Sequence, residues 1–126
     1  MTNVENVCKI EKEFCNTCSS HFAKIRPRIK DVIITKHFER DLKNEEEMNG
    51  IIKDVLDCSH INFHELHKFE ENIDGILLFR ARKENLHILY CIDRKMRIIF
   101  LRAIRNFDEY KDLLDDKKEL KKIIKV

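Results

Sequence analysis

Two arginines in the stretch FRARKENLHILY, residues 79–90, are the first side chains whose type and spacing suggest chemistry. Arg80 and Arg82 are two residues apart in a run typical of a β-strand, so both are expected on one face of a sheet. His87 begins the next strand-like run, and imidazole is the side chain that titrates closest to neutral pH. Two guanidinium groups beside an imidazole predict a surface that handles phosphate.

The charge around these residues is unevenly distributed. The chain of 126 residues has a formal net charge of +2, but residues 79–106 carry +6 and the rest carries −4. Eight basic side chains lie in that segment: Arg80, Arg82, Lys83, Arg94, Lys95, Arg97, Arg102 and Arg105. Its two acidic residues cannot neutralise them, which predicts an electrostatic footprint for phosphate. The alternative is an ordinary solvated sheet face, the usual explanation for an isolated arginine pair.

A possible metal site lies in the N-terminal stretch CNTCSSH. Cys15 and Cys18 have the C-x2-C spacing of half a zinc site, with His21 after them and Cys8 before them. No second pair of cysteine or histidine residues follows at zinc-finger distance, and helical periodicity explains the cysteines as residues of an apolar face. The sequence therefore favours reduced thiols in a helix over zinc, and predicts no cofactor.

A further candidate cluster near Cys58 consists of four histidines, His60, His64, His67 and His87. His60, His64 and His67 are close in sequence, but in HELHKF, read as a strand, His64 and His67 face opposite sides. Scattered surface histidines are therefore favoured over a metal site.

The elements that must position these side chains follow from hydrophobic periodicity. The pattern predicts a helix over residues 3–25 that Pro27 ends, a strand at 31–35, and one or two helices across 36–58. Strands are expected at 64–69, 76–82, 85–93 and 95–104, followed by a helix over 106–125. This order predicts an α+β fold with a small, mainly antiparallel sheet of three to five strands and N-terminal, middle and C-terminal helices.

The last expected strand alternates between two apolar faces with arginines at its ends. One face is predicted to hold Arg97, Ile99, Leu101, Ala103 and Arg105, and the other Met96, Ile98, Phe100, Arg102 and Ile104. Such a strand is expected to be buried in its middle.

The length of the chain predicts one domain over residues 1–126, with an amphipathic helical extension at 1–27. No stretch approaches the roughly 20 apolar residues of a membrane helix, and the N-terminus lacks the apolar core of a secretory signal. We therefore expect a cytoplasmic protein with reduced cysteines and no membrane partner.

The order of elements and the stretch FRARKENLHILY followed by KMRIIFLRAIRNFDEY resemble the RelE/ParE superfamily of toxins from toxin–antitoxin systems. Phe79, Arg80 and Arg82 match its aromatic residue and alternating basic residues. His87 with ILY, and Arg105 with Tyr110, match the later parts of the pattern. The similar region covers residues 31–110, with the C-terminal helix at 107–125 beyond the minimal pattern.

The resemblance implies a RelE-like, ribosome-associated endoribonuclease that cleaves mRNA without a metal and inhibits translation. Its chemistry needs a base for the 2′-hydroxyl, positive charge around the phosphate and a proton for the leaving 5′-oxygen. By position, Arg80, Arg82 and Arg105 would stabilise phosphate, and Tyr110 would stack on or orient a base. His87 would transfer a proton; this role is inferred from the chemistry of the imidazole. Three further basic residues, Lys83, Arg97 and Arg102, are RNA-binding candidates.

The implied partners are a cognate antitoxin and the ribosome with its mRNA. Two other functions stay open: a non-catalytic or ParE-like member that binds a partner or DNA gyrase, and a small zinc-stabilised nucleic-acid-binding module. The N-terminal helix must bury its apolar stripe, either on the core of the same chain or in a homodimer.

Overall fold

The computed structural model describes residues 26–57 and 63–124, which form an α+β structure as predicted. A 3₁₀ turn, η1 (Arg26–Arg28), precedes β1 (Asp31–Ile34), α3 (Lys36–Asp41) and α4 (Glu45–Leu56). Four strands follow: β2 (Glu65–Ile73), β3 (Ile76–Lys83), β4 (Leu86–Ile92) and β5 (Arg97–Ile104). The described part ends with α5 (Phe107–Asp115) and α6 (Lys117–Ile124). The expected helix at 3–25 lies outside the described residues, and so does any homodimer contact through it.

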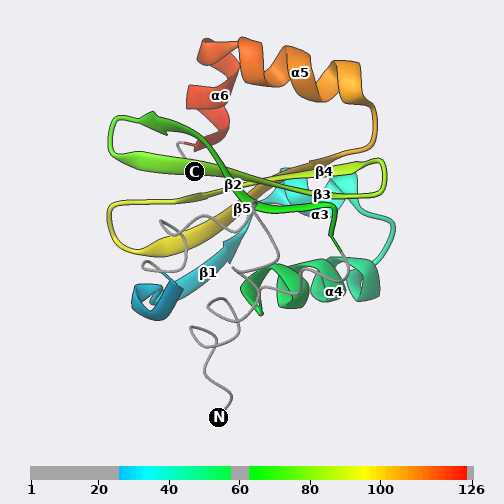
Figure 1. The fold of residues 1–126 in the computed structure, drawn as a ribbon, viewed down its shortest axis with the longest axis horizontal. Coiled ribbons are helices and arrows are strands. Elements are labelled where there is room, and N and C mark those ends of the chain that lie inside the picture. Colours follow the sequence, from blue (N-terminus) through cyan, green and yellow to red (C-terminus); the bar gives the residue numbers. More distant parts are fainter. Residues whose placement is uncertain (1–25, 58–62, 125–126) are drawn as a thin grey trace.

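The strands form one sheet in the order β1-β5-β4-β3-β2. β1 pairs with β5 in parallel, and the other neighbours are antiparallel, so the sheet is mainly antiparallel as expected. Helices α3 and α4 lie on one face, while α5 and α6 cover the other (Figure 1). The sheet is thus the middle layer of three.

The central strand β4 is buried at all seven positions. Its alternate side chains enter two separate apolar cores, because Ile88 and Tyr90 pack on the α4 side and Leu89 and Cys91 on the α5 side. A strand buried on both faces needs a near-continuous apolar sequence, which LHILYCI provides apart from His87.

A β-bulge in β5 changes the faces predicted for the end of that strand. Tyr90 pairs with Phe100 but Leu89 pairs with Arg102, so Leu101 is an extra residue in the ladder. After it the alternation shifts: Ala103 packs in the α4-side core and Ile104 in the α5-side core. The predicted faces of these two residues were therefore wrong, because strict alternation does not allow for a bulge.

The single helix expected at 106–125 is two helices. Asp116 separates them with extended backbone angles (φ −93°, ψ 90°). Its carboxylate accepts a hydrogen bond from the Glu119 backbone N–H, which caps the start of α6. The break lets both apolar stripes reach the same core, with Tyr110 and Leu113 from α5 and Leu120 from α6 buried there.

Asp41, the last residue of α3, forms hydrogen bonds with the bulged part of β5. Arg102 donates hydrogen bonds to both of its carboxylate oxygens, at 2.7 and 3.2 Å, and the Ala103 backbone N–H donates a third at 2.9 Å. Hydrogen bonds to a charged group in a partly buried setting stabilise more than exposed ones.

Replacing Asp41 with alanine should lower the free energy of unfolding by about 2 kcal/mol, because three charge-assisted hydrogen bonds are lost. Water can replace few of them, since the Arg102 side chain is mostly buried. Urea denaturation measures the loss. Asp57→Ala is the matched control, since Asp57 forms an exposed ion pair with Lys53 on α4 and should change stability little. Equal losses in the two variants would contradict the role given to Asp41.

Candidate functional site

An open groove on the α5 side of the sheet brings together three of the residues that the sequence singled out, Arg80, Arg82 and His87. This arginine groove has a volume of about 600 Å³ and is lined by Glu65, Arg80, Arg82, Glu84, Asn85, His87 and Phe107. Arg82 and His87 are paired neighbours on β3 and β4, so their side chains share a face. Arg80 and Arg82 also share that face, as their spacing predicted.

Two glutamates of β2 neutralise the arginines of the groove. Glu65 lies 3.2 Å from Arg80 Nη2 and 3.4 Å from Arg82 Nε, and Glu70 lies 3.7 Å from Arg80 Nε. Burial alone would raise the pKa of Glu65, but the charges of Arg80, Lys68 and Arg82 outweigh it and lower that pKa. The Glu65 carboxylate is therefore ionised at neutral pH.

His87 lies at the back of the groove with 6% of its surface exposed. Its ring stacks on Tyr110, with centroids 4.6 Å apart and an interplanar angle of 17°. Burial first, and then the charges of Arg80 and Arg82, lower its pKa below the ordinary value. The imidazole is therefore neutral at pH 7 and able to accept a proton. Its buried Nδ1 has no hydrogen-bond partner among the described residues.

Tyr110 is brought to the site but is not exposed for stacking on a nucleobase. Only 1% of its surface is accessible, because the ring is enclosed between α5 and the sheet. Phe107, one turn earlier on α5, is 57% exposed and lies 5.6 Å from the His87 ring centre. The available aromatic surface at the groove is thus that of Phe107, which was not among the predicted site residues.

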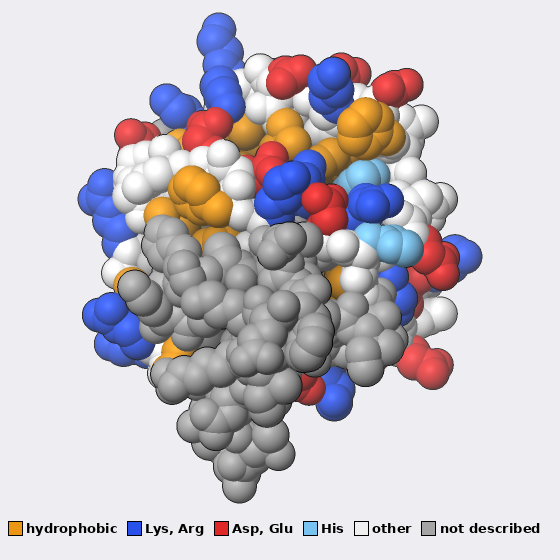
Figure 2. Space-filling model, viewed as in Figure 1, with side chains coloured by type: hydrophobic (Ala, Val, Ile, Leu, Met, Phe, Trp, Pro, Cys, Tyr) orange, Lys and Arg blue, Asp and Glu red, His pale blue; other side chains and the backbone are white. Residues whose placement is uncertain are grey.

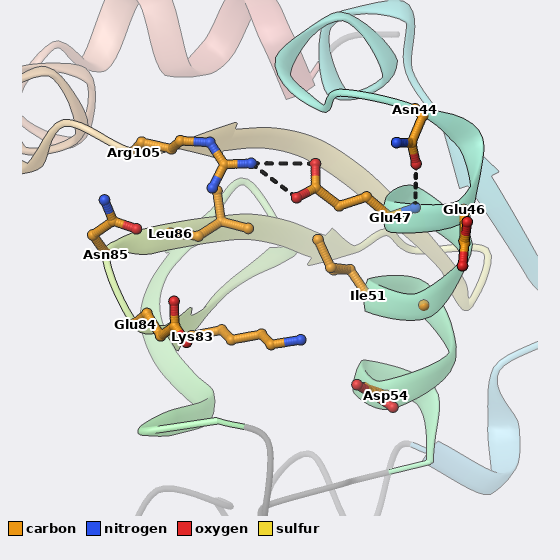
Figure 3. A pocket seen from close by; sticks show the side chains of 11 residues that line it. Asn44, Glu46, Glu47, Ile51, Asp54, Lys83, Glu84, Asn85, Leu86 and Arg105 are labelled. Atoms are coloured by element: carbon orange, nitrogen blue, oxygen red, sulfur yellow. Dashed lines mark hydrogen bonds and ion pairs between the residues drawn. The ribbon is translucent and has the colours of Figure 1, made fainter.

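Arg105 and Lys83 lie in a different pocket, of about 440 Å³, between the β3–β4 turn and α4 (Figure 3). Arg105 donates to both carboxylate oxygens of Glu47, at 3.0 and 3.2 Å. The pKa of Glu47 is lowered, first by the Lys43 backbone N–H and then, against desolvation, by Arg105. Since α4 and α5 lie on opposite faces of the sheet, the structure does not bring Arg105 to the arginine groove.

The two remaining RNA-binding candidates are also paired away from the groove. Arg97 lies 2.6 Å from Asp93, at the turn that precedes β5. Arg102 is bound by Asp41 and lies 3.6 Å from Glu109. Neither is among the residues that line the groove.

The ion pairs correct the charge argument made from the sequence. Five of the eight basic side chains of residues 79–106 pair with carboxylates: Arg80, Arg82, Arg97, Arg102 and Arg105. Most of these carboxylates come from β2, α3 and α4, outside the segment that was counted. Figure 2 shows the result, with basic and acidic side chains side by side next to the histidines.

The described residues contain no group of three or more potential metal ligands. His64 is exposed just before β2, whereas His67 is buried in a bulged part of that strand, with its Nδ1 2.7 Å from Tyr90 Oη. Burial raises the pKa of the Cys91 thiol to about 12, which makes it a poor nucleophile. Cys8, Cys15, Cys18, His21, Cys58 and His60 lie outside the described residues.

No helix in residues 26–57 and 63–124 has the length and apolar character needed to span a membrane. Comparison with known proteins adds no relative: no family model, curated protein or solved structure matches the chain.

The lowered pKa of His87 predicts a pH dependence of stability. Between that lowered pKa and the ordinary value near 6.5, the unfolded chain binds more protons than the folded chain, so stability increases with pH. Acidification from pH 7.5 to 5.5 should therefore destabilise the wild type more than His87→Gln in denaturant titrations. His37→Gln controls for the loss of an exposed imidazole, and an unchanged slope in His87→Gln would contradict the prediction.

Proposed function

We propose that the protein is a RelE-like toxin that cleaves mRNA without a metal ion. The observation that supports this is the arginine groove, where Arg80, Arg82 and a neutral His87 meet beside a carboxylate. These are the groups that cleavage by an internal 2′-hydroxyl requires: a proton acceptor and positive charge around the phosphate.

In the proposed reaction, neutral His87 accepts the proton of the 2′-hydroxyl as its oxygen bonds to phosphorus. The P–O5′ bond then breaks, and water in the open groove protonates the leaving oxygen. The products are a 2′,3′-cyclic phosphate and a 5′-hydroxyl end. The guanidinium groups stabilise the pentacoordinate phosphate, because negative charge accumulates on its oxygens in the transition state.

The two arginines have different access to the substrate. The Arg82 side chain is 39% exposed, and its one carboxylate contact is 3.4 Å long. Arg80 is 15% exposed and lies between Glu65 and Glu70. An incoming phosphate can therefore displace Glu65 from Arg82 more readily than it can reach Arg80. Arg82 is proposed to bind the phosphate directly, and Arg80 to act through its charge.

The proposal includes a cognate antitoxin, binding to the ribosome, a cytoplasmic location and no cofactor. These follow from the resemblance of FRARKENLHILY and its surroundings to the toxin family. Arg105 has no place in the proposed reaction, because Glu47 holds it on the other side of the sheet.

A non-catalytic member of the same fold is the second candidate. The observation that favours it is the pairing of Arg80 and Arg82 with Glu65 and Glu70, which leaves the groove without excess positive charge. Such a protein would bind a partner through this face and would leave RNA intact.

Cleavage of an oligoribonucleotide in the presence of EDTA separates these candidates. Arg82→Ala and His87→Ala should each reduce the cleavage rate by about a hundredfold or more, because each removes a group that acts in the transition state. The 2′,3′-cyclic phosphate end identifies the chemistry. Arg97→Ala is the matched control, since Arg97 pairs with Asp93 away from the groove.

Thermal unfolding of each variant shows whether a lost activity reflects a lost fold. Wild-type protein that leaves RNA intact, or folded Arg82→Ala that cleaves at the wild-type rate, would overturn the proposal. Growth arrest on expression in cells, abolished by Arg82→Ala, is the corresponding observation for the toxin.

A further inference from the structure

Phe107 has the most exposed large apolar side chain among the described residues. It is 57% exposed, compared with 40% for Phe69 and 37% for Val32. It also lines the arginine groove, together with Arg82 and His87. Single exposed apolar residues are common on protein surfaces, so the exposure of Phe107 matters because of the groups that lie beside it.

The periodicity of α5 directs the Phe107 ring toward the sheet. Phe107 is three residues before Tyr110, so the two side chains lie on the same side of the helix. Tyr110 reaches the α5-side core, where it is buried and stacks on His87. Phe107 is outside that core, and its ring centre is 5.6 Å from that of His87 with a tilt of 50°. An apolar ring surface therefore stays in contact with solvent at the groove.

The charges of the groove cannot by themselves hold an anion tightly. Glu65 pairs with both arginines, and Glu84 adds a second carboxylate to the lining. With His87 neutral, the two basic and two acidic side chains of the lining cancel. A phosphate that replaces Glu65 at Arg82 gains little net attraction, so a ligand needs a further contact to bind well.

An aromatic ring and an accessible guanidinium group are the contacts that the groove offers. The Arg82 side chain is 39% exposed. Arg82 pairs with His87 across β3 and β4, and His87 contacts Phe107, so the guanidinium and the exposed ring flank the same imidazole. A nucleotide joins a flat aromatic base to a phosphate through one sugar. Proteins that bind single strands combine a cationic groove with aromatic rings on which the bases stack.

We propose that Phe107 is the stacking platform for the base of the nucleotide whose phosphate binds at Arg82, and that it gives the groove a preference for purines. The larger ring system of adenine or guanine covers more of the exposed ring than cytosine or uracil does, and stacking strength sets such preferences. Phenylalanine has no hydrogen-bonding group, so it selects by ring size. The inference rests on the proposed function for its link to RNA, but nucleotide binding is testable without cleavage.

Calorimetric titration of the full chain with adenosine monophosphate, uridine monophosphate and ribose phosphate tests the platform. Adenosine monophosphate should bind about tenfold more tightly than ribose phosphate, because only the nucleotide has a base that can stack. The affinity of uridine monophosphate should lie between the two. Phe107→Leu keeps an apolar side chain against His87 but removes the aromatic face. It should therefore weaken binding of adenosine monophosphate to the level of ribose phosphate and leave ribose phosphate unchanged, whereas Arg82→Ala should weaken both.

Tryptophan fluorescence gives an independent readout, because the chain contains no tryptophan. In Phe107→Trp, adenosine monophosphate should quench the emission and ribose phosphate should not, since quenching requires a base stacked on the indole. Phe69→Trp is the matched control, because Phe69 is also partly exposed but packs on Phe79, which belongs to the α4-side core. Its emission should not respond to either ligand.

The outcomes for the platform and for the nuclease are distinguishable. Nucleotide binding that depends on Phe107 supports the platform even if RNA is never cleaved, in which case only the proposed function fails. Cleavage that depends on Arg82 but keeps its rate and base preference in Phe107→Leu overturns the platform and leaves the nuclease intact. Wild-type protein that does not distinguish adenosine monophosphate from ribose phosphate, or equal quenching of the two tryptophan variants, also overturns the platform and leaves the exposed ring to a protein partner.

Discussion

Burial of β4 on both faces is the constraint on which the rest of the structure depends. Each of its seven side chains must leave water, so the sheet needs a layer of helices on either side. Helices α3 and α4 cover one face, and α5 and α6 cover the other (Figure 1). His87 is the polar exception within β4, and its position under α5 gives the imidazole its low pKa.

The candidate site depends on carboxylates as much as on arginines. Glu65 and Glu70 of β2 pair with Arg80 and Arg82 of β3, and they cancel the charge that a phosphate would otherwise meet. In the proposed function, a phosphate would therefore compete with a carboxylate, and such exchange would be easiest at the partly exposed Arg82. The groove is better suited to a selective contact than to general attraction of nucleic acid.

Helix α5 covers one side of the proposed site. Phe107 lies at the rim of the arginine groove, while Tyr110 stacks on His87 and is buried. The break at Asp116 holds this geometry, because it turns α6 back onto the same core. A straight helix through residue 116 would carry Leu120 away from that core.

The sequence by itself determined the α+β class, the order of the strands and the common face of Arg80 and Arg82, because these follow from local periodicity. It did not show that β2 continues to Ile73, beyond the predicted strand at 64–69. It did not reveal the bulge at Leu101, since one extra residue leaves no compositional signal. The pairing of Arg105 with Glu47 and of Arg80 with Glu65 was decided by the tertiary structure alone. Ion pairs and pKa shifts depend on distances between residues far apart in the chain, and only folding sets those distances.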